Sequence, residues 1–401
     1  MKYLTLRGAH QAVVGLAATA FVFGPAIAWS MGVAPKAIEN RALSPAPDAS
    51  KGWDALDALA PWATDHLPGR ERAVHLNAWV DYYALGQLPA TAPGGPPPGT
   101  APGGPKGASA VPPVVRGGDG YLFYGDDFAS ACGRTAGYEQ SLKSLAGLAE
   151  IIRASGRRVA FTIAPNKSSV ATDLLPRVIP RGSCAARGIK RQNQLLDNLQ
   201  NPLYVSIRKP LAEAHKAGKQ VFLRTDTHWT TLGGAMYAQA LAAHLDPALS
   251  RRLQLKPERM TKVGELTRLA GLTTTESVMS SALSSGATAT PTPTPVAHGQ
   301  GRPVYQPSGW VTRPATGLIQ GRTLLLGDSF TVVAALQSLQ PLFAQGRCVL
   351  FGLAPESMLV SEIRAADTVV IEVAQRYVVG HVSTLPKFQS KVAAALGVRE
   401  P

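Results

Sequence analysis

Three side chains of the types used in nucleophilic acyl transfer stand at two places in the sequence. Asp226 and His228 lie two residues apart in "TDTHWTT", and Ser329 follows much later in "LLLGDSF". A Ser hydroxyl becomes a nucleophile beside a base, and an imidazole oriented by a carboxylate is a common base for this purpose. The chain order Asp, His, Ser is acceptable because the same geometry recurs in several orders. The sequence therefore predicts that both stretches belong to one catalytic site.

Each motif also has a simpler interpretation. A Ser after Gly-Asp is often the cap of a turn, and Asp226 with His228 is equally compatible with a hydrogen-bonded structural pair. Trp229 fits packing under the site better than contact with a substrate, while Phe330 is a weaker candidate for substrate contact. Asn166 is a weaker candidate for an oxyanion donor. The catalytic interpretation depends on finding both motifs together, each at the end of a predicted strand.

The elements that must position these residues alternate between strands and helices. Apolar runs in "RVAFTIAP", "KQVFLRTD", "RTLLLGDS", "RCVLFGL" and "DTVVIEVA" predict strands, and helical spacing appears elsewhere, for example over residues 138–155, 188–217 and 230–245. Continuous apolar strands alternating with helices indicate a mostly parallel sheet covered on both faces. The predicted fold class is α/β, a three-layer α/β/α sandwich. In such folds the chemistry lies where strands end and helices begin.

Other segments lie outside this alternation. Lys2 and Arg7 precede an uncharged apolar stretch over residues 12–32, so residues 1–32 are expected to be a signal peptide or a membrane anchor. Whether the segment is cleaved stays open. Residues 33–89 have helical spacing, and residues 90–113 are Pro/Gly-rich and predict a flexible insertion. The catalytic domain is expected over residues 114–395, with a second low-complexity loop insertion at residues 280–301.

The three cysteines bear on the compartment. Export would place the chain in an oxidising environment, where disulfides persist. Cys132 and Cys184 lie in polar, loop-like contexts and are expected to pair, whereas Cys348 lies in an apolar strand and is expected to stay a buried thiol. Three free thiols are the alternative. No Cys-x-x-Cys motif occurs, so a zinc or thioredoxin-like site has no support. Serine-dependent acyl transfer needs no metal or soluble cofactor, so none is expected.

The charge of the chain limits its partners without choosing among them. Lys and Arg number 40 against 26 Asp and Glu, a net charge of +14. The basic residues are scattered and form no nucleic-acid-binding signature, so nucleic acid is not an expected partner. An acidic polysaccharide and an anionic lipid surface both fit the sign of the charge.

The motifs together resemble a known family. "DTHWT" with a later "GDSF" is similar to the periplasmic, SGNH hydrolase-like alginate O-acetyltransferases. Supporting stretches are "VVRGGDGYLFYGDDF", "IAPNKSSVATDLLP", the lead-in "LPGRERAVHLNAWVDYYALG" and the closing strand "DTVVIEVAQRYV", where Gln375 replaces an expected acid. The resemblance covers about residues 60–385 without the two low-complexity stretches.

This resemblance implies an SGNH-like sandwich in which Asp226, His228 and Ser329 form the triad. It implies acetyl transfer to hydroxyls of an exopolysaccharide in the periplasm, with a membrane-bound O-acyltransferase as acetyl donor and other polysaccharide secretion proteins as partners. The inner membrane would be reached through residues 12–32. We expect no separate carbohydrate-binding module in the residues after the last predicted strand. The alternatives are a carbohydrate acetylesterase with the same triad and a non-catalytic polysaccharide-binding or secretion scaffold.

Overall fold

The computed structural model of the chain describes residues 27, 31–32, 44–66, 70–84, 88, 111–299 and 302–398. The chain divides into two compact units. One contains the N-terminal helices together with Arg268–Leu272, and the other contains Val114–Thr267 and Thr273 onward. The predicted anchor at residues 12–32 and the Pro/Gly-rich insertion at residues 90–113 lie almost entirely outside the described residues. Within the described part of the chain, no helix has the length and apolar character needed to cross a membrane.

The N-terminal unit is helical, as the spacing over residues 33–89 predicts. It contains the 3₁₀ turns η1 (Ala49–Asp54), the helices α2 (Ala55–Asp65) and α3 (Arg70–Trp79), and the π-helical turn η2 (Val80–Ala84). The Asp65 carboxylate accepts hydrogen bonds from the amide and hydroxyl of Ser44, at 3.1 and 2.5 Å, which ties the segment before η1 to the end of α2.

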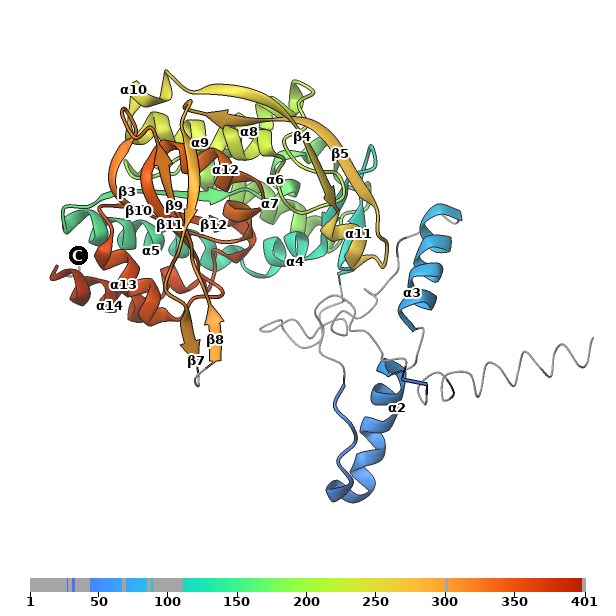
Figure 1. Cartoon of the computed structure of the whole chain (residues 1–401). Coiled ribbons are helices and arrows are strands. Elements are labelled where there is room, and N and C mark those ends of the chain that lie inside the picture. The colour runs from blue at the N-terminus through green and yellow to red at the C-terminus, as the bar shows by residue number, and fades with distance from the viewer. Residues whose placement is uncertain are drawn as a thin grey trace, which may run out of the picture. The chain divides into compact units, whose positions relative to one another are not determined.

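A six-stranded mixed sheet forms the centre of the second unit (Figure 1). Its order is β3-β12-β10-β11-β9-β6, and the first four strands are parallel while β9 and β6 are antiparallel to their neighbours. The bounds are β3 Arg158–Ala164, β12 Thr368–Ala374, β10 Ile319–Gly327, β11 Phe343–Leu350, β9 Ser308–Arg313 and β6 Thr288–Thr292. The predicted mostly parallel sheet is confirmed, and β10 lies within it with a parallel neighbour on each side.

Helices cover both faces of the sheet, which gives the three layers predicted. Side chains alternate along each strand, so Leu325 and Val370 enter one core while Leu324 and Val369 enter the other. Helices α8 (Arg208–Lys216), α9 (Thr231–Leu245) and α12 (Leu336–Leu339) pack on the first face; α5 (Thr135–Ala154), α13 (Glu356–Ala365) and α14 (Pro386–Leu396) pack on the second (Figure 1).

The remaining elements border this sandwich. A long antiparallel ribbon of β4 (Gln254–Val263) and β5 (Thr275–Ser284) matters most for the site, with the short helix α11 (Glu265–Leu269) between its strands. The others are β1 (Val114–Arg116), β2 (Leu122–Tyr124), α4 (Gly125–Gly133), α6 (Lys167–Val170), η3 (Thr172–Leu174), α7 (Gly182–Asp197), α10 (Pro247–Ser250), β7 (Ala297–Gly299), β8 (Arg302–Tyr305), η4 (Thr331–Ala335), η5 (Gln340–Leu342), η6 (Gln375–Tyr377) and η7 (Val382–Thr384).

The prediction of a loop insertion over residues 280–301 is wrong. This segment contains the end of β5, all of β6 and β7, and β6 forms an edge of the central sheet. The repeated Thr in "TATPTPTP" is β-branched and favours an extended backbone. The low-complexity composition of the segment instead suggested a loop. Pro291 is tolerated because an edge strand leaves one row of backbone groups unpaired.

Two other predicted elements also differ. The stretch "KQVFLRTD" joins no sheet; it folds back, with the Thr230 amide donating to Val221 (2.9 Å) and the Leu223 amide donating to His228 (3.2 Å). The helix predicted over residues 188–217 is interrupted between α7 and α8. There the backbone runs beside β3, through hydrogen bonds of Phe161 with Leu203 and Val205, both at 2.8 Å.

The predicted disulfide is present. Cys132 and Cys184 are bonded, with Cα atoms 5.1 Å apart and a sequence separation of 52. The link joins α4 to α7, and closing a loop of this length lowers the entropy of the unfolded chain by an equivalent of about 4 kcal/mol. Cys348 is a free, buried thiol, and burial raises its pKa to about 12.

Candidate active site

Ser329 lies on a turn directly after the central strand β10. The strand ends at Gly327, where a Cβ would lie 2.2 Å from the Thr331 hydroxyl, so only glycine permits a turn this tight. The Asp328 carboxylate accepts hydrogen bonds from the amides of Phe330 and Ala374, both at 2.8 Å. These two bonds fix the turn to β12, and Ser329 remains partly exposed.

Asp226 and His228 lie in the folded-back loop before α9. Asp226 Oδ1 accepts hydrogen bonds from the His228 amide at 3.0 Å and lies 2.6 Å from ring Nδ1, so the carboxylate orients the imidazole. This is the contact that the spacing predicts. Both side chains are buried, and α9 begins shortly after them with Thr230 as its N-cap.

The environment of Asp226 favours its ionised form. Burial alone would raise its pKa, but the hydrogen bond and charge interaction with His228, together with Lys262 and the Glu265 amide, hold the pKa below its usual range. Lys262 Nζ lies 3.0 Å from Oδ2, and the Glu265 amide donates to the same oxygen at 3.0 Å. An anion held this way fixes the tautomer in which Nδ1 carries the proton and Nε2 is free to accept one.

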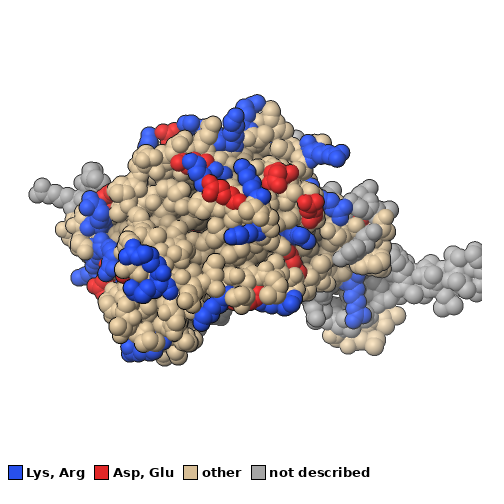
Figure 2. Space-filling model, turned by 90° about the horizontal axis from the view of Figure 1, so that it is seen from above, with Lys and Arg blue, Asp and Glu red and all other residues tan. Residues whose placement is uncertain are grey.

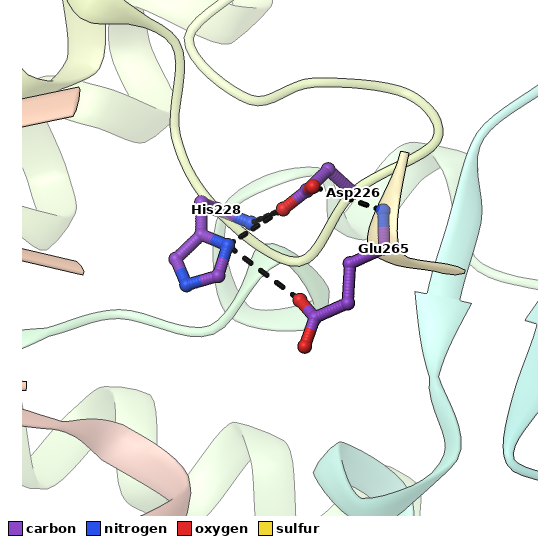
Figure 3. A group of neighbouring side chains, drawn as sticks. All are labelled: Asp226, His228 and Glu265. Carbon is purple, nitrogen blue, oxygen red and sulfur yellow. Dashed lines mark hydrogen bonds and ion pairs between the residues drawn. The ribbon is translucent and has the colours of Figure 1, made fainter. Parts of the chain in front are cut away.

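Glu265 adds a second carboxylate beside the ring (Figure 3). Its Oε2 lies 3.6 Å from His228 Nδ1 and accepts a hydrogen bond of 2.6 Å from the Thr227 hydroxyl. Asp226, His228 and Glu265 have donor atoms within 4.8 Å of one another, a spacing that also suits a metal ion. Here Asp226 Oδ2 already accepts from Lys262, so the geometry is that of carboxylates orienting an imidazole.

The β4–β5 ribbon holds the Asp-x-His loop in place. The Glu276 carboxylate on β5 accepts hydrogen bonds from the amides of Arg224 and Thr225, both at 3.0 Å, and from the Thr225 hydroxyl at 2.8 Å. At Gly264 a Cβ would lie 2.3 Å from the Thr225 carbonyl oxygen, so the end of β4 approaches the loop more closely than another residue would allow. The loop therefore depends on side chains of the ribbon and not on a sheet ladder.

Two aromatic residues join the two halves of the site. The Trp229 indole N–H donates to the Phe330 carbonyl at 3.0 Å, and the Phe330 ring lies 5.0 Å from the His228 ring, centroid to centroid. His228 Nε2 is buried and has no hydrogen-bond partner among the described residues, so the predicted contact with Ser329 stays a prediction. Trp229 and Phe330 are fully buried and contact protein, which fits a packing role, and their contact with a substrate stays a prediction.

Asn166 lies at the carboxyl end of β3, beside a buried arginine. Arg376 donates to the Asn166 side-chain oxygen at 3.2 Å and to Asp127 at 3.0 Å, and its guanidinium lies 5.2 Å from the Phe330 ring centroid. Gln375, which stands where an acid is expected, accepts from the Asn166 amide at 3.0 Å. Asn166 is thus fixed near the turn of Ser329, and its role as an oxyanion donor remains untested.

Comparison with known proteins bears on this domain. The sequence model of a family described as the SGNH hydrolase-like domain of the acetyltransferase AlgX matches residues 114–302. The match includes Asp226 and His228 and ends before Ser329. Residues 114–302 are thus similar to the SGNH hydrolase-like domains of that family.

Curated relatives of this SGNH hydrolase-like domain are proteins named probable alginate O-acetylase AlgJ. The protein from Pseudomonas putida is 33% identical over 141 residues, which are 33% of this chain and 33% of the relative. The protein from Azotobacter vinelandii is 28% identical over 142 residues, 34% of each chain. The chain thus matches about a third of the length of these relatives.

Solved structures similar to this one in fold include the following two. The O-acetyltransferase domain of Pseudomonas putida AlgJ has a TM-score of 0.43 and 22% identity, covering 70% of this chain and 98% of that chain. Bacillus cereus PatB1 with a sulfonyl adduct has a TM-score of 0.48 and 14% identity, covering 67% and 97%.

Lys167 is a buried cation next to the Asp-x-His loop of the SGNH hydrolase-like domain. Its ammonium donates to the carbonyls of Leu122 at 2.7 Å and Arg224 at 3.1 Å, so it ties β2 to the start of the loop. Burial lowers its pKa to about 7, although Asp226 and other acids oppose the shift. Lysines are rarely fully buried, yet Lys167 is only 1% exposed.

We expect Lys167 to make stability rise with pH above neutrality. Between pH 7 and the ordinary lysine value of about 10.4, the unfolded chain binds a proton that the folded chain does not, so the free energy of unfolding increases with pH. Relative to Lys167→Met, the wild-type protein should gain about 2 kcal/mol between pH 7 and pH 9. Urea unfolding of both proteins at the two pH values measures this, and an unchanged difference would refute it.

Several residues of the site escape motif analysis. Lys262, Glu265 and Glu276 lie in the ribbon, where nothing in spacing marks them as close to residues 224–228. Glu372 is different, because it is an acid inside the apolar strand "TVVIEVA". Acidic side chains are almost never fully buried unless they are paired. An acid inside an apolar strand is therefore a sequence signal for a candidate site residue.

Proposed function

We propose that this chain is an exported O-acetyltransferase that adds acetyl groups to hydroxyls of an exopolysaccharide through an acetyl intermediate on Ser329. The observation that carries the proposal is the oriented His228, whose Nε2 has no hydrogen-bond partner in the described part of the chain and whose ring packs against Phe330 in the turn of Ser329. The names of the curated relatives, probable alginate O-acetylases, support the same class of reaction.

The proposed chemistry has two half-reactions. His228 Nε2 takes the Ser329 proton while Oγ bonds to the acetyl carbon of a donor ester, and the imidazolium then gives that proton to the departing oxygen of the donor. In the second half, Nε2 takes the proton of a sugar hydroxyl, whose oxygen bonds to the acetyl carbon as Ser329 Oγ leaves and is reprotonated. Asp226 stabilises the imidazolium in both halves, and no soluble cofactor is required.

The proposed acceptor is an acidic polymer such as a uronate, and the proposed compartment is the periplasm. The net charge of +14 suits a polyanion. Figure 2 shows Lys and Arg spread over the viewed face with Asp and Glu among them, so charge favours the class of polymer without marking a binding track. The acetyl donor would be a membrane-bound O-acyltransferase, with the inner membrane reached through residues 12–32.

Transfer to sugar distinguishes this proposal from hydrolysis. The protein is incubated with 4-nitrophenyl acetate and an oligouronate, and acetylated oligosaccharide and free acetate are measured by mass spectrometry and an acetate assay. We expect acetyl groups on the oligosaccharide, with a neutral glucose oligomer as control. Free acetate alone, unaffected by the oligouronate, would indicate a carbohydrate acetylesterase instead, and the absence of both products would favour a non-catalytic scaffold.

A further inference from the structure

Glu372 is a buried acid behind the turn that carries Ser329. Even-numbered side chains of β12 face the core under α9, so Glu372 points into the same core as Val370 and Ala374. The side chain is 1% exposed. An ionised carboxylate in such a core costs several kcal/mol unless it is paired with a cation or fully hydrogen-bonded.

The hydrogen bonds of Glu372 go to the nucleophile turn. Its Oε2 accepts from the Asp328 amide at 3.1 Å and from the Thr331 hydroxyl at 2.9 Å, which are the residues on either side of Ser329 and Phe330. Its Oε1 has no hydrogen-bond partner among the described residues. The carboxyl therefore holds both ends of a turn whose middle is Ser329.

The groups around Glu372 disfavour a negative charge. Asp328 brings a carboxylate close to it, while Tyr237 from α9 and Cys348 from β11 are neutral at physiological pH because burial raises the pKa of each. Burial first, and Asp328 second, raise the pKa of Glu372 well above its usual value. The Asp328 carboxylate accepts hydrogen bonds from the amides of Phe330 and Ala374, whereas one oxygen of Glu372 has no partner among the described residues.

We propose that Glu372 is a neutral carboxylic acid that positions the turn carrying Ser329. This inference rests on the proposed function, because positioning matters only if Ser329 is the nucleophile. As a neutral acceptor, Glu372 fixes the turn without placing a second negative charge beside Asp328 and the oxyanion that acyl transfer forms.

Glu372→Gln tests the neutral state through stability. Above the ordinary Glu value of about 4.3 the unfolded wild-type chain ionises at this position while the folded chain stays neutral, so wild-type stability falls as pH rises. We expect the Gln variant to have a higher unfolding midpoint than wild type at pH 7, with the difference closing as pH falls to about 4.5. A lower midpoint at pH 7, with a deficit that grows with pH, overturns the neutral state.

Glu362→Gln is the matched control, since Glu362 is also buried but ion-paired with Arg322 and Arg347. The same substitution removes two ion pairs there and should lower the midpoint at pH 7. Opposite signs for the two variants in one protein would separate a neutral acid from an ionised one.

The rate of Ser329 acetylation tests positioning. Glu372→Gln keeps an acceptor oxygen and should acetylate at close to the wild-type rate, whereas Glu372→Leu should be slower by about 10²-fold because a misplaced turn misaligns the nucleophile. Wild-type rates in the Leu variant would overturn the positioning role. If that variant does not fold, Thr331→Val, which removes one donor to Oε2, should slow acetylation several-fold, and an unchanged rate would count equally against the role.

Failure of the proposed function looks different from failure of this inference. If Ser329 is not the nucleophile, wild-type protein carries no acetyl adduct on Ser329, whatever residue occupies position 372. The unfolding comparison does not depend on activity and still decides whether Glu372 is neutral.

Discussion

Ser329→Ala should abolish both the burst of 4-nitrophenolate and the acetyl adduct that we expect 4-nitrophenyl acetate to produce with wild-type protein. Only the hydroxyl group is lost, and its oxygen would be the atom that bonds to the acetyl carbon. The acetylation rate should therefore fall by roughly 10⁴-fold or more. Stopped-flow absorbance measures the burst, and peptide mass spectrometry measures the adduct on the peptide containing residue 329. The unfolding midpoint should barely change, since a partly exposed hydroxyl adds little to stability.

Ser357→Ala serves as the control for this experiment. Ser357 is exposed on α13, which covers the face of the sheet opposite to α9, and its substitution should leave burst and adduct intact. A Ser329→Ala protein that keeps wild-type acetyl transfer would exclude Ser329 as nucleophile and favour the scaffold interpretation.

Asp226→Asn should reduce the acetylation rate of Ser329 by about 10⁴-fold while leaving the fold intact. Asp226 Oδ1 contacts both the amide and Nδ1 of His228, and an Asn amide that faces Nδ1 with its NH₂ group would stabilise the tautomer with the proton on Nε2. An imidazole protonated there cannot accept the Ser329 proton. Burst kinetics at pH 7.5 measure the loss.

Asp246→Asn is a suitable comparison, because Asp246 caps α10 through the amides of Ala248 and Leu249 and has no part in the site. It should cost some stability and no activity. Near-wild-type acetylation by Asp226→Asn would show that His228 is not the base, or that Glu265 alone can orient it.

The four parallel strands of the sheet could be predicted from the sequence because their composition is distinctive, whereas the antiparallel strands β9 and β6 were not predicted. The runs around Phe161, Leu325, Cys348 and Val370 are continuous and apolar, and strands buried on both faces need that composition. The sequence also placed Asp226, His228 and Ser329 at the ends of apolar runs. The disulfide followed from the polar settings of two cysteines.

What could not be predicted depends on contacts distant in sequence. The stretch around Phe222 has the composition of a strand, yet it folds back on Trp229 because the ribbon residue Glu276 satisfies the amides of the bend. The threonines of β6 are strand residues, but the low-complexity sequence around them led to the prediction of a loop. Lys262 and Glu265 have no local pattern, because their partner Asp226 belongs to another segment and only the fold brings them together.

The two halves of the site should differ in how readily they open. The turn of Ser329 continues from β10, whose backbone is hydrogen-bonded on both sides by β11 and β12. The amide hydrogens of β10 and of this turn should therefore exchange with solvent only when the whole sheet unfolds. The Asp-x-His loop has no ladder and depends on the side chains of the ribbon, so its amides should exchange through a smaller local opening. Heat or mild denaturant would then separate base from nucleophile while the sheet remains folded, and activity would be lost before the fold.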